Sequence, residues 1–155
     1  MNPQIEYETM AREEMLICTR KDHPLSQFAK PNPESTYPWL DTALLKDERI
    51  LQLMPEQRTR QITDDYFRDN NLKFESVMYT SNMSAIMELV AVGYGVSFIF
   101  ETHLRHRTVA KPIDCYSFGN PRTCSDFVAA YRKGSYLPVY AREFIEIARQ
   151  LFEAQ

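Results

Sequence analysis

The segment from Ser81 to Phe100 constrains the fold more than any other part of the chain. It begins with small polar residues, continues with apolar residues at helical spacing, and ends in an apolar run over residues 96–100 after Gly93 and Gly95. Apolar residues at every third or fourth position indicate a helix with one buried face, and a glycine suits the left-handed backbone that ends a helix. A short, wholly apolar run is typical of a strand that is covered on both faces. The segment therefore predicts a helix with Ser81 as its N-cap, a glycine turn and a buried strand.

The residues before this segment repeat the same alternation. Residues 50–53 predict a strand, residues 57–70 a helix with Ile62, Tyr66 and Phe67 on its inner face, and residues 72–80 a second strand. Together these elements give the order strand, helix, strand, helix, strand. That order implies parallel strands joined by right-handed crossovers, which is half of a doubly wound α/β fold. Further strands are predicted at residues 15–19, 113–118 and 127–131, and an amphipathic helix from about residue 140.

Composition narrows the class of protein. A chain of 155 residues is long enough for one domain or two small lobes, and its 44% hydrophobic and 25% charged residues are typical of globular proteins. The net charge of -3 argues against a nucleic-acid-binding surface, which is normally basic. The sequence shows no signal peptide and no apolar run that would cross a bilayer, so we expect a cytoplasmic protein without a membrane partner. Cys18, Cys115 and Cys124 lack the spacing of metal ligands, so we expect reduced thiols and no metal site.

Polar residues follow two of the predicted parallel strands at the point where each strand ends. Ligands of open parallel sheets bind beyond the carboxyl ends of the strands, close to helix N-termini. This rule selects Met54 and Gln57 after the first strand and Thr80, Ser81 and Asn82 after the second. The helix N-terminus and the side chains after Thr80 favour an anionic group such as a carboxylate. The alternative is that Ser81 only caps its helix.

Three further residues have both a binding and a structural interpretation. Phe98 and Phe100 lie in the third parallel strand and either contact a ligand in a cleft or pack in the core. Arg20 follows the predicted strand at residues 15–19 and either faces the cleft or is a solvated surface residue. All three remain candidate binding residues at this point.

No residue pattern predicts catalysis or a cofactor. His23 has no nucleophile or carboxylate partner that the spacing identifies, so a structural role is favoured over a catalytic one. Gly93-Tyr94-Gly95 follows a helix and precedes a strand, whereas a dinucleotide-binding loop follows a strand and opens a helix. We therefore expect no catalytic residue, no nucleotide and no other cofactor.

Four stretches, in this order, resemble the effector-binding domain of LysR-type transcriptional regulators. They are LICTRKDHPL (16–25), RQITDDYF (60–67), MELVAVGYGV (87–96) and YRKGSYL (131–137). The resemblance implies a two-lobed α/β fold like that of type 2 periplasmic binding proteins, with a small-molecule effector bound between the lobes. It also implies that residues 49–107 form the complete second lobe and that residues 1–48 and 108–155 form part of the first lobe.

The resemblance also implies what this stretch of chain lacks. The first lobe of the family begins with strands and helices that precede the strand at residues 15–19, and a winged helix-turn-helix precedes those. We therefore expect a chain truncated at its N-terminal side, which reaches operator DNA only through a helix-turn-helix that it does not contain. An incomplete first lobe leaves sheet edges and apolar surface uncovered, so we expect a homo-oligomer.

The implied function is that of a regulatory domain that senses a small metabolite and is not an enzyme. One alternative is a solute-binding protein of a transport system with the same fold, and another is an enzyme of the related two-lobed class. A third is a thiol switch, as in peroxide-sensing relatives of the family. Those relatives place their cysteines in the region that corresponds to residues 57–70, which contains no cysteine here. Cys115 lies in a predicted strand, where a buried and inert thiol is expected.

Overall fold

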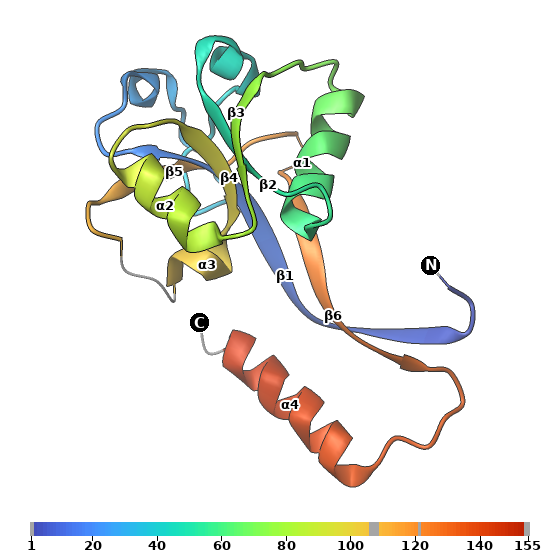
Figure 1. Cartoon of the computed structure of the whole chain (residues 1–155). Coiled ribbons are helices and arrows are strands. Elements are labelled where there is room, and N and C mark those ends of the chain that lie inside the picture. Colours follow the sequence, from blue (N-terminus) through green and yellow to red (C-terminus); the bar gives the residue numbers. More distant parts are fainter. Residues whose placement is uncertain (1, 106–108, 121, 154–155) are drawn as a thin grey trace. The chain divides into compact units, whose positions relative to one another are not determined.

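The computed structural model describes residues 2–105, 109–120 and 122–153, and its contacts divide the chain into two compact units (Figure 1). The larger unit is Glu14–Thr123. The smaller unit combines Met1–Glu13 with Cys124–Gln155. Among the described residues, no helix combines the length and apolar character needed to span a membrane.

The larger unit is built on a mixed sheet with the strand order β3-β2-β4-β1-β5. Its strands are β1 (Ile5–Arg20, of which the second half belongs to this unit), β2 (Ile50–Leu53), β3 (Ser76–Thr80), β4 (Val96–Phe100) and β5 (Ile113–Tyr116). Its helices are α1 (Arg58–Asp69), α2 (Met83–Ala91), the short α3 (Glu101–Arg105), and the 3-10 helices η1 (Pro24–Phe28) and η2 (Thr42–Asp47). Strand β2 is parallel to β3 and to β4, which confirms the predicted order of strands and helices. Strand β1 is antiparallel to both β4 and β5.

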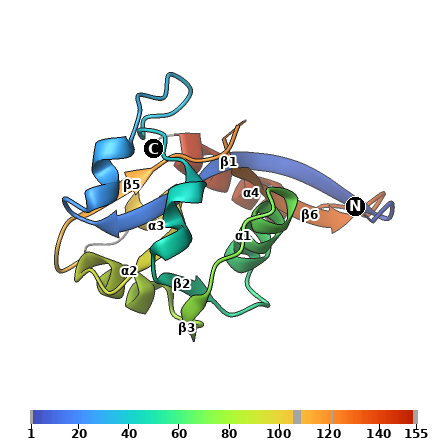
Figure 2. The same ribbon diagram turned by 90° about the horizontal axis from the view of Figure 1, so that it is seen from above.

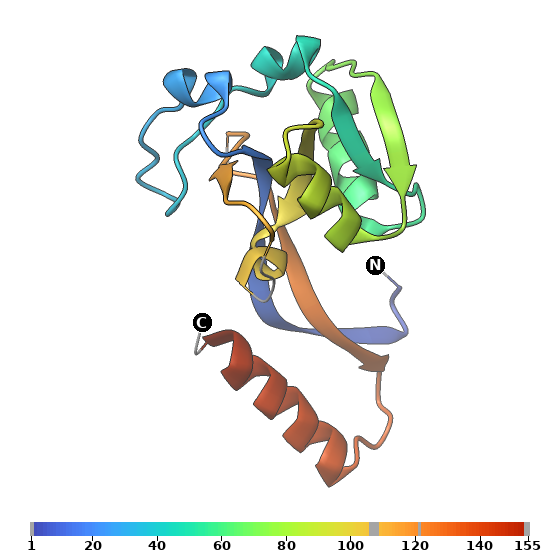
Figure 3. The same cartoon turned by 60° about the vertical axis from the view of Figure 1, so that its left-hand side comes forward.

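Helices α1 and α2 cover opposite faces of this sheet (Figures 1 and 3). Alternate residues of one strand point to opposite faces, so each central strand contributes to two hydrophobic clusters. Ile17 and Phe98 pack in the cluster that contains Phe67 of α1, whereas Leu16 and Ile99 pack in the cluster of α2. Burying each such large side chain contributes about 1.5–3 kcal/mol to folding. Coverage on both faces explains why β4 is apolar throughout.

The glycines after α2 occupy positions that other residues fit poorly. Gly93 has φ +79°, and a Cβ atom there would lie 2.6 Å from Cδ of Arg20. A Cβ atom on Gly95 would lie 2.5 Å from the carbonyl oxygen of Arg49. The predicted left-handed end of the helix is therefore confirmed at Gly93, and Gly95 permits a close backbone approach to the residue before β2.

The smaller unit consists of the first half of β1, strand β6 (Cys124–Arg132) and helix α4 (Val139–Glu153), which Figure 2 shows from above. Strand β6 pairs with β1, and the N–H of Lys133 donates to the carbonyl of Gln4 at 2.9 Å. Helix α4 is held by an ion pair between Arg149 and Glu8 and by the ring of Phe152, whose centroid lies 4.8 Å from that of Phe127. The predicted C-terminal helix is confirmed.

The larger unit extends on both sides of residues 49–107, the range that the resemblance assigns to the second lobe. The second half of β1 lies between β4 and β5 in its sheet, in the register Met15 with Phe100. The ring of Phe118 contacts the rings of Tyr66 and Phe98, with centroids 4.9 and 5.3 Å away. Residues 14–48 and the described residues 109–120, 122 and 123 therefore lie in the same compact unit as α1 and α2. The expected boundary between residues 107 and 108 falls outside the described residues.

Candidate functional site

Five of the predicted binding residues meet at one edge of the sheet in the larger unit. Because β2 and β3 are parallel, their carboxyl ends lie side by side. The N–H of Met54 donates to the carbonyl of Thr80 at 3.1 Å, and the side-chain amide of Gln57 donates to the carbonyl of Ser81 at 3.1 Å. These bonds join the segment before α1 to the segment before α2. We call this group, Met54, Gln57, Thr80, Ser81 and Asn82, the carboxyl-edge site.

Asn82 caps helix α2, and the prediction that Ser81 is the N-cap was wrong by one residue. Oδ1 of Asn82 accepts from the N–H groups of Ser84 at 3.0 Å and Ala85 at 3.3 Å. Its own N–H donates to Oγ1 of Thr80 at 3.1 Å. Serine and asparagine are about equally good caps, so the sequence does not decide which of two adjacent residues begins the helix. Since Oδ1 is used by the helix, the exposed side-chain amide nitrogen of Asn82 is the group that can donate to a ligand.

The N-terminus of α1 differs from that of α2 because no side chain among the described residues caps it. Gln57 occupies the N-cap position, but its amide group donates to the carbonyl of Ser81 instead. Its Oε1 atom is buried and has no donor in the described part of the chain. The first N–H groups of a helix have no acceptor within the helix, so those of residues 58–60 form the positive end of α1 at this edge.

Arg60 adds a fixed cation in the first turn of α1, and sequence reasoning missed it. Its guanidinium donates to Asp64 at 2.7 Å and to the carbonyl of Leu53 at 3.3 Å, and it lies 5.2 Å from the ring centroid of Tyr79. The bond to Leu53 places it at the carboxyl end of β2. Its signal in the sequence is an arginine in the first turn of a helix that directly follows a strand.

Glu14 and Glu101 form an acidic pair where β4 ends and β1 enters the sheet, and the sequence did not predict this pair either. Because Met15 is the register partner of Phe100, the preceding Glu14 lies beside Glu101, and the Glu14 N–H donates to Glu101 Oε1 at 3.3 Å. Glu14 is only 5% exposed. Its Oε2 accepts from Ser35 at 2.7 Å and Arg122 at 3.3 Å, while its Oε1 is buried without a donor among the described residues.

Three predicted residues lie apart from the carboxyl-edge site. Arg20 ends a strand that runs antiparallel to β4, so it lies at the opposite end of the sheet, where it donates to the carbonyls of two adjacent residues in the following turn. Phe98 and Phe100 are 3% and 9% exposed and belong to the cluster beneath α1. Their side chains therefore pack in the core, and we leave all three residues out of the site.

His23 has a structural position. Its Nδ1 accepts from the N–H of Leu25 at 3.3 Å and so caps η1, and its Nε2 lies 3.6 Å from Glu48. Within the described ranges, no three His, Cys, Asp or Glu side chains are grouped so that they would hold a metal ion.

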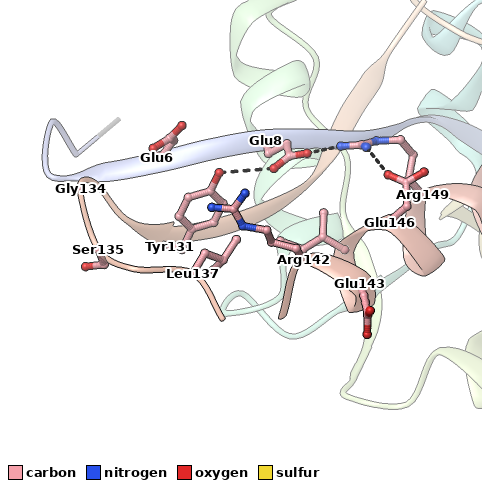
Figure 4. A pocket seen from close by; sticks show the side chains of 11 residues that line it. Glu6, Glu8, Tyr131, Gly134, Ser135, Leu137, Arg142, Glu143, Glu146 and Arg149 are labelled. Atoms are coloured by element: carbon pink, nitrogen blue, oxygen red, sulfur yellow. Dashed lines mark hydrogen bonds and ion pairs between the residues drawn. The ribbon is translucent and has the colours of Figure 1, made fainter. Parts of the chain in front are cut away.

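A separate hollow of about 660 Å³ lies in the smaller unit between β1, β6 and α4 (Figure 4). It is lined by four glutamates and two arginines, and among these groups Arg149 pairs with both Glu8 and Glu146. Glu8 accepts from Arg149 and, at 3.4 Å, from the hydroxyl of Tyr131. Burial and the nearby Glu6 and Glu8 raise the pKa of Tyr131. Sequence reasoning did not anticipate this hollow, because it depends on the packing of α4 on the first half of β1.

The chain matches the family model of the LysR substrate binding domain over residues 1–153. None of the curated proteins compared with it matches. Solved structures share its fold. The regulatory domain of CcmR from Synechocystis PCC6803, in complex with 2-PG, has a TM-score of 0.80 at 16% identity and aligns with 97% of this chain and 68% of its own.

Two further solved structures are similar in fold to this chain. The effector binding domain of QuiR, in complex with shikimate, has a TM-score of 0.72 at 18% identity, with 99% of this chain and 68% of its own covered. HinK, a LysR family transcriptional regulator from Pseudomonas aeruginosa, has a TM-score of 0.74 at 16% identity, with 98% of this chain and 49% of its own covered. The predicted periplasmic-binding-protein-like α/β fold is confirmed. On the match over residues 1–153, the chain belongs to the LysR substrate binding domain family.

Proposed function

We propose that this chain is the effector-sensing part of a LysR-type transcriptional regulator and that it binds a small anionic metabolite at the carboxyl-edge site. The observation that carries the proposal is the hydrogen bond from the Gln57 side chain to the Ser81 carbonyl. It brings the start of α1 and the start of α2 to one place, so that two helix N-termini serve one ligand.

The electrostatics of the edge favour an anion. The uncapped first turn of α1 offers backbone N–H groups, and the amide nitrogen of Asn82 adds a side-chain donor. Helix N-termini of this kind stabilise negative charge by about 0.3–1 kcal/mol each at exposed positions. Arg60 contributes less than an unpaired cation would, because Asp64 already accepts from it. Two structural neighbours were solved with the small ligands 2-PG and shikimate, which supports a small-molecule site in this fold.

The proposed mechanism is a shift between two arrangements of lobes. The effector lies between the carboxyl-edge site and the first lobe of the complete domain, and it favours the arrangement that it fits better. A strong shift of such an equilibrium requires the effector to bind one state more tightly by about 5.5 kcal/mol. The regulator then reaches operator DNA through its helix-turn-helix, in the cytoplasm and without catalysing a reaction.

Helix α4 supports the proposal that the regulator works as an oligomer. Tyr140, Phe144, Ile147 and Leu151 follow one another at helical spacing and are 56–75% exposed. An apolar stripe of this size normally marks a surface that another polypeptide covers. We expect the isolated chain to self-associate through this stripe, which we call the α4 stripe.

Thermal-shift screening of organic anions, with 2-PG and shikimate included, tests the ligand proposal. A longer protein with the complete first lobe is screened beside the chain itself. An anion that raises the melting temperature, and loses this effect in Ser81→Ala and Asn82→Ala, supports the site.

The matched control is Asp41→Ala, which removes the cap of η2 at the other end of β2 and leaves the carboxyl-edge site unchanged. If ligand response and induction in cells are the same in the site variants as in this control, the site assignment is wrong.

A further inference from the structure

We propose that Cys18 and Cys115 form a redox-active dithiol that closes to a disulfide when the protein meets a small hydroperoxide. This site is independent of the carboxyl-edge site and does not rest on the proposed effector binding. It also lies outside residues 57–70, the region in which the resemblance places the cysteines of peroxide-sensing relatives.

The strand register places the two thiols opposite each other. Cys18 of β1 is the register partner of Cys115 of β5 in an antiparallel pair, and their Sγ atoms are 3.1 Å apart. Directly opposite residues of antiparallel strands have Cα atoms about 4.5–5.5 Å apart, which lies within the range of about 4.4–6.8 Å found across disulfides. The two sulfurs can therefore bond without a change in strand pairing.

The two thiols differ in access, which assigns them different roles. Cys18 is fully buried in the cluster beneath α2, whereas Cys115 is half-buried and lines a cavity of about 310 Å³. The other lining residues are mainly apolar, with Tyr37 and Asp114 as the polar groups. A small oxidant that enters this cavity meets Cys115 first. Burial, and then the hydrogen bond with Cys115, raises the pKa of the Cys18 thiol.

The chemistry balances in two steps. The thiolate of Cys115, formed by loss of its proton to solvent, attacks the distal oxygen of the hydroperoxide, and the O–O bond breaks. The sulfur becomes a sulfenic acid, and the remaining fragment takes up a proton and leaves as an alcohol, or as water from hydrogen peroxide. The Cys18 sulfur then attacks the sulfenic sulfur and loses its proton, and the hydroxyl group leaves as water. Two thiols are oxidised and one hydroperoxide is reduced.

Proximity makes the second step faster than further oxidation. The attacking and attacked sulfurs are already neighbours, so closure is intramolecular and needs no diffusion of a second thiol. The bond joins residues separated by 97 positions in sequence, and closing a long loop restricts the unfolded chain. We therefore expect the oxidised protein to melt at a higher temperature than the reduced protein.

Peptide mass mapping of the wild-type chain after hydrogen peroxide treatment tests the proposal. The protein is quenched, unfolded and alkylated with iodoacetamide before digestion. The expected result is a linked pair of peptides containing Cys18 and Cys115, lighter by two hydrogen atoms and restored to two alkylated peptides by dithiothreitol. The melting temperature rises on oxidation, and Cys124→Ser behaves like the wild type. Cys115→Ser leaves Cys18 reduced.

Three outcomes would overturn the proposal. In the first, Cys18 stays alkylatable while Cys115 accumulates as sulfinic or sulfonic acid. In the second, Cys124 oxidises at peroxide concentrations that leave the pair reduced. In the third, the linked peptides join Cys124 or a second chain. All three are read from the wild-type protein, so the result does not depend on whether a cysteine variant folds.

Discussion

Asn82 carries two separable roles, and two substitutions distinguish them. Asn82→Ala removes the acceptor for the N–H groups of Ser84 and Ala85, so it destabilises α2 and also removes the amide donor. Loss of an N-cap of this type costs about 0.5–2 kcal/mol. Asn82→Asp keeps the acceptor and adds a negative charge where the dipole of α2 favours one, so its stability should lie within about 0.5 kcal/mol of the wild type.

Thermal unfolding followed by circular dichroism measures the first role. For a chain of this size, 1 kcal/mol corresponds to a change in melting temperature of about 2–4 °C. Asn82→Ala should therefore lower the melting temperature by a few degrees, whereas Asn82→Asp should leave it nearly unchanged. If Asn82→Asp is as unstable as Asn82→Ala, the two hydrogen bonds to Oδ1 do not act as a cap.

Thermal shift with an anionic ligand measures the second role. The aspartate has no amide donor and repels an anion, so Asn82→Asp should abolish the ligand-dependent rise although the protein is as stable as the wild type. An Asn82→Asp protein that still responds fully to an organic anion would refute an anion site beside Asn82. Asp41→Ala again controls for lost stability without a change at the site.

Three other predictions concern the core, the pH dependence and the α4 stripe. Phe118→Ala should lower the free energy of unfolding by about 3–5 kcal/mol in urea titration, because the ring is fully buried between α1 and β4; a loss below about 1 kcal/mol would remove residue 118 from this core. Burial raises the pKa of Cys18 and of Tyr116, so the folded chain holds these protons more tightly than the unfolded chain. That stability is complete below the unfolded pKa values, about 8.5 for Cys and 10 for Tyr, and is lost as the pH rises through the folded values. Urea midpoints should therefore fall from pH 8 to pH 10.5, and less steeply in Cys18→Ala; equal slopes would contradict this origin. Phe144→Glu with Ile147→Glu should convert a self-associating chain to a monomer in sedimentation velocity, and a wild-type chain that is already monomeric would contradict our reading of the α4 stripe.

The central part of the fold can be predicted because its signals are local. The apolar spacing of α2, the left-handed Gly93 and the apolar run of β4 are each visible within a few residues. Strand β1 is different. Its first half, from Ile5 to Glu13, carries charged residues at positions 6, 8, 12 and 13 and has no long apolar run, so only residues 15–19 were predicted as strand. Its pairing with β4, β5 and β6 depends on contacts between distant parts of the sequence.

The candidate site, too, could be predicted only where it depends on local signals and not on contacts between distant strands. The rule of carboxyl ends places Met54 and Thr80 together because it needs only the parallel direction of β2 and β3. The rule does not extend to Arg20, because β1 runs antiparallel to its neighbours and its carboxyl end lies at the opposite edge of the sheet. The facing of Cys18 and Cys115 is likewise a property of register, and the spacing of the cysteines gave no sign of it.

Alternate residues of β1 pack in two different hydrophobic clusters, and this restricts which insertions and deletions the strand can accept during evolution. A slip of one residue would turn Leu16 and Ile17 toward each other's clusters and would turn Cys18 to the other face of the sheet. A slip of two residues would preserve which side chains face which helix. Homologous strands should therefore gain or lose residues in even numbers between Glu14, the first residue of β1 in the larger unit, and the turn at Asp22, and odd changes should be confined to positions outside this stretch.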